Sequence, residues 1–311
     1  MYRKTILKAV SGALFLFSAI FQIPAQTSGE AVPDGIVIFQ KAYPDVVFTP
    51  EYDTSLKDWK ISVTVPDKPG ERGHGRTYEF YWCGGSMLPK GELKNKDKYW
   101  TLLYGYAREL ADPADFDQEQ IKAMRNFGST DSRMNGQGTP MFFFEALYSA
   151  DTKAHLEAHL KKVSFLGKTV TVHERLEAPL LRVQDRIQKA ARGDKEIMDF
   201  ITSIKTAEAY YWRIISGTTR KSFHSLGIAV DIQPKSLNGK QIYWSWAKEK
   251  NPDGWMLTPL SKRWIPPKKV LDIFEEEGFI WGGKWIIFDN MHFEYHPELI
   301  LHNFGTFAIQ N

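Results

Sequence analysis

The sequence predicts an α+β fold, in which helices and antiparallel strands follow one another without a repeated strand–helix–strand rhythm. Three observations support this fold class. Residues 59–65 alternate apolar and polar side chains, as a half-buried strand does, and residues 76–83 form the returning strand of a hairpin. Four apolar residues recur at helical spacing: Leu176, Leu180, Val183 and Ile187. Short strands at 279–281 and 291–295 are expected near the C-terminal end.

The first 25 residues have the composition of a secretory signal peptide. Arg3, Lys4 and Lys8 precede an apolar stretch over residues 9–23, and small residues follow at 24–25. This stretch is shorter than the roughly 20 apolar residues that span a bilayer. We therefore expect export to the periplasm or the exterior, with no stable membrane span once residues 1–25 are removed.

The remaining elements follow from local patterns. Residues 26–56 contain three prolines and no clear period, so we expect a loop-rich lead-in. Asp117 followed by Gln120 predicts a capped helix that runs to Phe127. Helical spacing also recurs over residues 142–148, 152–163, 176–193 and 197–209, and a last short helix is expected between Pro266 and Gly278.

Charge and cysteine content exclude two classes of protein. Lys and Arg number 40 against 37 Asp and Glu, but three of the basic residues lie in the predicted signal peptide, so the rest of the chain is neutral. Without a cluster of basic residues, nucleic-acid binding is not expected. The single cysteine, Cys83, excludes an intrachain disulfide and a cysteine-rich zinc module. A metal site in this chain has to use histidine and carboxylate ligands.

The segment from Ser222 to Asp231 carries the first candidate ligands. His224 offers an imidazole nitrogen, and Gly227 allows the backbone to turn tightly. Asp231 lies within a predicted buried strand over residues 228–232, on the same face as the small Ala229. A buried carboxylate needs a cation or several donors, and zinc accepts this combination of ligands. The alternative interpretation is a buried ion pair or a capped turn.

The segment from Phe288 to Tyr295 can complete such a site. His292 lies in an aromatic strand and can be the third ligand, as a catalytic zinc requires. Asp289 lies three residues earlier and can act as general base. Its alternative roles are a helix cap or a residue that orients a metal ligand. Glu294 shares the strand face of His292, so it either orients that imidazole or competes for the role of base.

Together these motifs resemble a known family. The pattern Ser-x-His-x-x-Gly-x-Ala-x-Asp over residues 222–231, followed by acidic-x-x-His over 289–292, is similar to the LAS zinc metallopeptidases. These include D-alanyl-D-alanine carboxypeptidases of the vancomycin-resistance type and L-alanyl-D-glutamate endopeptidases of phage lysins. The resemblance implies a zinc peptidase domain over residues 170–311, with a small antiparallel sheet and flanking helices, as in LAS or hedgehog-like domains. Residues 26–169 form a preceding α+β region of unknown role.

The resemblance also implies the roles of individual residues. One Zn²⁺ is bound by three ligands: His224, Asp231 and His292. Asp289 is the catalytic base, Arg213 polarises the scissile carbonyl, and Ser222 helps to bind the substrate. From its position beside Trp212, Arg213 could instead form a structural cation–π contact.

The implied function is hydrolysis of peptidoglycan stem peptides. Asp289 stands where the carboxypeptidases usually have Glu, which favours the endopeptidase branch. Two alternatives share the same site residues. One is a non-catalytic, zinc-stabilised module that binds the cell wall or a partner. The other is a peptidase of small D-Ala-containing peptides outside the wall.

Overall fold

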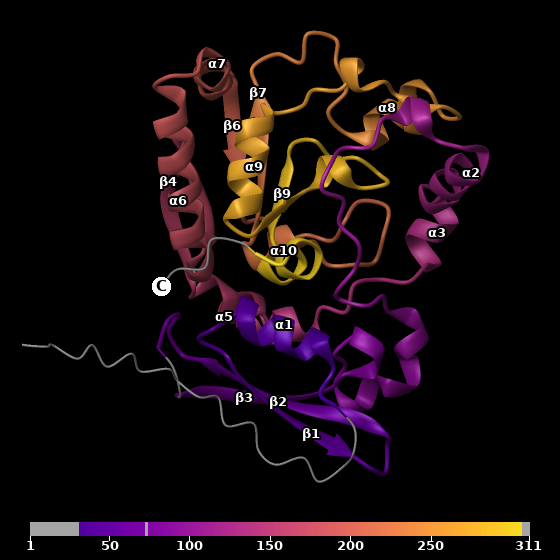
Figure 1. Cartoon of the computed structure of the whole chain (residues 1–311), viewed down its shortest axis with the longest axis vertical. Helices are drawn as coiled ribbons and strands as arrows, with labels where there is room; N and C mark the ends of the chain where they lie inside the picture. Colours follow the sequence, from indigo (N-terminus) through magenta and orange to yellow (C-terminus); the bar gives the residue numbers. More distant parts are fainter. Residues whose placement is uncertain (1–30, 72–73, 307–311) are drawn as a thin grey trace, which may run out of the picture. The chain divides into compact units, whose positions relative to one another are not determined.

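The computed structural model describes residues 31–71 and 74–306, so the predicted signal peptide lies outside the described residues (Figure 1). The first helix, α1 (Asp34–Ala42), precedes an antiparallel sheet of β1 (Val47–Asp53), β2 (Asp58–Pro66) and β3 (Gly75–Tyr81). The predicted hairpin over 59–83 is therefore confirmed. The predicted loop over 26–56 is wrong for residues 34–53, because α1 buries Ile36 and Phe39, and β1 pairs with β2. Pro50 is tolerated because β1 is an edge strand.

Short helices follow: α2 (Gln118–Phe127), α3 (Thr130–Asn135), α4 (Phe142–Leu147) and α5 (Lys153–Glu157). The capping box of Asp117 and Gln120 is present at the start of α2. The predicted helix over 152–163 is wrong beyond residue 157, because β4 (Leu160–Phe165) and β5 (Lys168–His173) form a hairpin there. Leu166 and Gly167 both have positive φ, which is the backbone of a two-residue hairpin turn.

The C-terminal half begins with α6 (Glu174–Ala191) and α7 (Lys195–Ser203). The predicted helix over 197–209 is wrong after Ser203, because residues 204–208 form β6 (Ile204–Glu208) and pair with β7 (Ala229–Pro234). Then follow α8 (Trp244–Lys250), α9 (Lys268–Glu276), β8 (Phe279–Trp281), β9 (His292–Tyr295) and α10 (Pro297–Phe304). Short 3-10 helices lie between these elements: η1 (Cys83–Gly85), η2 (Lys90–Lys98), η3 (Pro113–Asp115), η4 (Phe223–Leu226), η5 (Trp255–Leu257), η6 (Leu260–Lys262) and η7 (Gly282–Lys284).

The sheet that carries the site is antiparallel, with strand order β6-β7-β9-β8. Helices α6 and α9 cover one face of it, where Leu180 and Phe274 pack in the same core as the strands. The sheet side chains in this core are apolar: Val230, Ile232 and Phe293. Because strand side chains alternate, the opposite face carries the polar residues of the motifs: Asp231, His292 and Glu294. The α+β class and the small antiparallel sheet with flanking helices are confirmed.

A second core connects the N-terminal sheet to the turn before β7. Phe143 of α4 is fully buried there with Ile61 of β2. Leu226 and Ile228, which flank Gly227, are fully buried in the same core. The predicted boundary between the N-terminal region and the peptidase domain, between residues 169 and 170, lies within the hairpin of β4 and β5. That boundary remains a prediction. Within the described part of the chain, no helix is both long and apolar enough to cross a membrane.

Candidate metal centre and active site

Strand pairing brings two of the predicted ligands together. Asp231 of β7 lies directly opposite His292 of β9 in the antiparallel register. His224 lies in η4, and this short helix ends at Gly227, whose φ is +68°. A Cβ at Gly227 would lie 2.7 Å from the backbone nitrogen of His173, so both the turn and the close approach require glycine. Residues far apart in the sequence thus meet at one point of the sheet.

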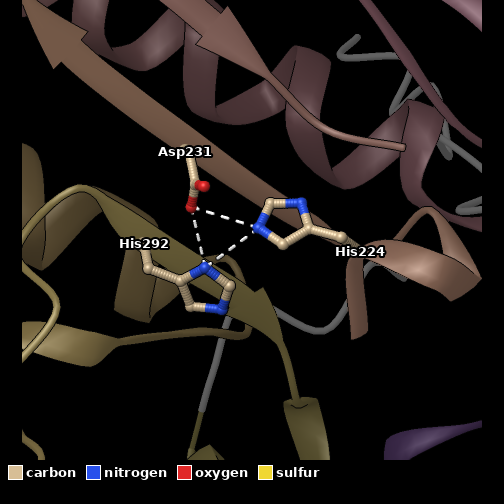
Figure 2. A group of neighbouring side chains, drawn as sticks. All are labelled: His224, Asp231 and His292. Carbon is tan, nitrogen blue, oxygen red and sulfur yellow. Dashed lines mark hydrogen bonds and ion pairs between the residues drawn. The ribbon is translucent and has the colours of Figure 1, made fainter. Parts of the chain in front are cut away.

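Three side-chain atoms converge at this point (Figure 2). His292 Nδ1 lies 2.8 Å from Asp231 Oδ1, and His224 Nε2 lies 3.2 Å from each of these two atoms. Two imidazole nitrogens and one carboxylate oxygen are a donor set that suits a divalent metal. His224, Asp231 and His292 therefore form a cluster that could hold a metal ion, as the sequence predicts.

The other nitrogen of each imidazole is held by an acceptor outside the cluster. His224 Nδ1 lies 2.5 Å from the carbonyl oxygen of Ala209, and His292 Nε2 lies 2.8 Å from Glu294 Oε1. A ring nitrogen that donates its hydrogen to such an acceptor leaves the lone pair on the opposite nitrogen. When both imidazoles are neutral, both lone pairs therefore face Asp231, which is the tautomer arrangement that metal binding needs.

The charges of the cluster shift its pKa values strongly. Burial alone would raise the pKa of Asp231, but hydrogen bonds from His224 and His292 hold it far below its usual range. Burial alone would lower the pKa of His292, but Asp231 and Glu294 raise it well above the usual value for histidine. The cluster without metal therefore binds a proton on His292 strongly.

Asp289 lies in the loop between β8 and β9. Its backbone nitrogen donates to the carbonyl of Gly282 over 3.0 Å, and its carbonyl accepts from the nitrogen of His292 over 3.3 Å. Burial raises the pKa of its carboxyl to about 7, with the negative charge of Asp231 adding to the shift while His292 and Arg213 oppose it. Within residues 31–71 and 74–306, its buried Oδ1 has no hydrogen-bond partner. This unsatisfied oxygen makes Asp289 a candidate proton acceptor.

Arg213 begins a hairpin that ends at Ser222. The turn is closed by a bridge between Ile214 and Lys221, and the nitrogen of Ser222 donates to the carbonyl of Arg213. Arg213 lines a pocket of about 470 Å³ together with His224 and Asp231. Its positive charge also acts to lower the pKa of Asp289. The pocket therefore combines two candidate metal ligands with a cation.

Ser222 is placed differently from the other predicted residues. Its side chain is buried and accepts a hydrogen bond from the nitrogen of His224 at the start of η4, as a helix-capping residue does. A contact between Ser222 and a substrate remains a prediction. Ser225, which the sequence reasoning missed, accepts from the nitrogen of Arg213 over 2.9 Å and donates to its carbonyl over 2.6 Å. Ser225 thus positions the backbone of Arg213.

The acceptor Glu294 is itself part of a longer buried chain of contacts. Glu294 Oε2 lies 3.2 Å from His296 Nε2, and His296 Nδ1 lies 2.7 Å from Glu298 Oε1. The hydroxyl of Tyr43, the residue directly after α1, donates to Glu298 Oε2 over 2.6 Å. Sequence reasoning missed this role of His296, although histidine and glutamate occupy alternate positions from 292 to 298. The chain links the metal cluster to the first helix.

Comparisons with known families give two matches. Residues 216–295 match the family model described as D-alanyl-D-alanine carboxypeptidase. The match confirms the resemblance to LAS-type peptidases. It spans the three candidate ligands and Asp289, while Arg213 lies three residues before it. The LAS-type segment, residues 216–295, is therefore similar to a carboxypeptidase-like peptidase family.

The region before the LAS-type segment matches a different family model. Residues 36–103 match one described as a domain of unknown function (DUF8518). That match covers α1 and the sheet of β1, β2 and β3. No curated protein and no solved structure matches the chain significantly.

Proposed function

We propose that this protein is an exported zinc peptidase that hydrolyses peptidoglycan stem peptides. The observation that carries the proposal is the convergence of His224 Nε2, Asp231 Oδ1 and His292 Nδ1 at one point of the sheet. Asp289, whose buried Oδ1 has no hydrogen-bond partner among the described residues, lies three residues before His292. Four tetrahedral ligands at zinc distances of 2.0–2.1 Å are roughly 3.3 Å apart. The 2.8–3.2 Å separations of the three ligand atoms are close to this value, which supports a zinc ion.

The chain supplies three ligands, which is the number that a catalytic zinc requires. Zinc bound there would lower the pKa of a water molecule to about 7 and polarise a peptide carbonyl. Asp289 accepts the proton of the attacking water and later passes it to the leaving amine. Arg213 donates hydrogen bonds to the oxygen that becomes negative as the carbonyl is attacked. Glu294 keeps the imidazole of His292 in the tautomer that binds metal.

Two cleavage sites fit this mechanism. One is the D-Ala-D-Ala bond, as the description of the matched family suggests. The other is the L-Ala-D-Glu bond, which the shorter side chain of Asp289 favours. The cleaved bond follows from the masses of the products, because the first releases a single D-Ala and the second releases a peptide that begins with D-Glu.

The test is incubation of the purified protein with muropeptides and identification of the products by mass spectrometry. Wild type should cleave a stem peptide, whereas Asp289→Asn should bind zinc and cleave nothing. Asp272→Asn, at a surface position of α9, is the matched control and should behave as wild type. Equal product profiles for wild type and Asp289→Asn would refute the catalytic proposal.

Metal content separates an enzyme from a binding module. Elemental analysis should find one zinc per chain in wild type and in His302→Ala, whose imidazole is exposed in α10, but not in His224→Ala. One zinc per chain without hydrolysis of any stem peptide would instead support a non-catalytic, zinc-stabilised module.

A further inference from the structure

A larger pocket, of about 680 Å³, lies beside the candidate active site and has no assigned ligand. Its walls come from residues 99–141 of the N-terminal region, from the 213–222 hairpin and from residues 284–287. Much of the wall is aromatic and includes Trp100, Phe127 and Trp285. Cavities of roughly 300–1,000 Å³ with apolar walls and a few polar groups are typical of ligand sites. Its size and lining are therefore those of a binding site.

Two residues that line this pocket contact His292 of the candidate metal cluster. Glu294 lines the pocket and accepts from His292 Nε2 over 2.8 Å. The ring of Trp285 also lies 5.3 Å from the ring of His292, measured between centroids. None of the residues that line the 470 Å³ pocket line this one. A peptide bound in the larger pocket would therefore lie next to the candidate active site without occupying it.

The charges that line the pocket do not cancel. Lys221 and Lys284 are neutralised, because their ammonium groups lie 2.5 Å from Glu145 and Glu275. The one carboxylate in the lining, Glu294, is already engaged with two histidines. The two remaining cations form no salt bridge with any described residue: Arg133 and Arg220. The pocket thus retains two positive charges.

Both arginines are held in place by neutral carbonyl groups. Arg220 donates to the carbonyls of Gln137 and Arg133, over 2.7 Å and 2.5 Å, and Arg133 donates to the carbonyl of Ser216 over 2.9 Å. A Cβ at Gly138 would lie 2.7 Å from Cδ of Arg220, so glycine gives that side chain its space. Burial lowers the pKa of each guanidinium, and the charge of Arg133 lowers that of Arg220 further. An anion would relieve both effects.

We propose that this pocket binds a carboxylate-bearing part of the stem peptide, through the guanidinium groups of Arg133 and Arg220. The identity of the peptide rests on the proposed function. A planar guanidinium recognises carboxylates with two parallel hydrogen bonds, and such bonds are stronger away from bulk water. Trp100, whose ring lies 5.5 Å from the guanidinium carbon of Arg220, provides an apolar surface beside that group. The N-terminal region would therefore contribute to substrate selection.

The test measures binding without turnover, in the full chain that carries Asp289→Asn. The probes are a soluble disaccharide-tetrapeptide and the same molecule with its carboxylates converted to carboxamides. The dissociation constant is obtained by calorimetry, and quenching of tryptophan fluorescence reports on Trp100 and Trp285. We expect the carboxylate form to bind at least tenfold more tightly than the carboxamide form, since a hydrogen bond to a charged group contributes about 1.5–3 kcal/mol.

Arg133→Gln and Arg220→Gln should each weaken binding of the carboxylate form about tenfold or more and reduce the preference over the carboxamide form. Arg125→Gln is the matched control, because its guanidinium also donates to a backbone carbonyl, that of Asp253 over 3.1 Å, but does not line the pocket. Melting temperatures show whether each variant is folded. If Arg220→Gln does not fold, Arg133→Gln alone decides the question. Equal affinity for the two probes, or equal losses in Arg125→Gln, would overturn the proposal.

Hydrolysis by the wild-type chain separates this inference from the proposed function. If wild type cleaves muropeptides and Arg133→Gln and Arg220→Gln leave KM unchanged, the pocket assignment is wrong and the peptidase proposal stands. If the carboxylate probe binds in an arginine-dependent way and wild type cleaves no muropeptide, the pocket assignment stands and the peptidase proposal is wrong.

Discussion

The contact between Tyr43 and Glu298 should be a strong link between the first helix and the C-terminal sheet. Glu298 is fully buried at the first turn of α10, and its two oxygens accept from His296 and Tyr43. Tyr43→Phe removes one donor and leaves Glu298 Oε2 without it. A buried hydrogen bond to a charged group contributes about 1.5–3 kcal/mol to stability. At roughly 2–4 °C per kcal/mol for a chain of this size, the melting temperature should fall by about 3–12 °C.

The assay is thermal unfolding of wild type and variants, followed by circular dichroism at one pH. Tyr78→Phe in β3 is the matched control, because its hydroxyl lies outside this network, and it should change stability by less than about 0.5 kcal/mol. A double-mutant cycle of Tyr43→Phe with Glu298→Gln should give a coupling energy of the same order as the single loss. Equal melting temperatures for Tyr43→Phe and Tyr78→Phe would refute the reasoning.

Three further predictions concern the site. Asp231 and Glu294 raise the pKa of His292 despite its burial, so zinc binding should release at least one proton and should weaken as pH falls. Calorimetry in two buffers with different ionisation enthalpies measures this proton release, and a release of zero protons would contradict the prediction. Gly282→Ala would place a Cβ 2.8 Å from the carbonyl oxygen of Asp289 and should lower the rate of hydrolysis without loss of zinc. Gly91→Ala is the control, because a Cβ there would lie in open space, and equal rates of hydrolysis for the two variants would count against the reasoning. Ser225→Ala removes both bonds to the backbone of Arg213 and should lower kcat about tenfold with zinc retained, so an unchanged kcat would contradict a positioning role.

The candidate metal cluster was the most predictable part of the molecule. Gly227 and Asp231 follow His224 at short fixed spacings, so local backbone geometry nearly determines how these residues lie. The alternation of side chains along a strand also separates His292 and Glu294 from the apolar Phe293. Where one face of a sheet is buried, such patterns predict which side chains share the other face.

Contacts between distant segments could not be predicted in this way. Nothing near Tyr43 in the sequence indicates Glu298. The pocket of Arg133 and Arg220 likewise depends on hydrogen bonds between helix α3 and the distant 213–222 hairpin. The strands at 160–165 and 204–208 were misassigned for a related reason. Their apolar residues also fit a helical period, and pairing with β5 and β7 decides their conformation.

The opposed faces of β7 and β9 have a consequence for changes in chain length. Asp231 and His292 meet because they lie opposite each other in the register, while Val230 and Phe293 point into the core. One residue inserted between Asp289 and His292 would either change the distance between these two side chains or exchange the two faces of β9. The second outcome would bury an imidazole and a carboxylate among apolar side chains and expose Phe293. Substitutions can tune this site gradually, but insertions and deletions in residues 289–294 act as all-or-none changes.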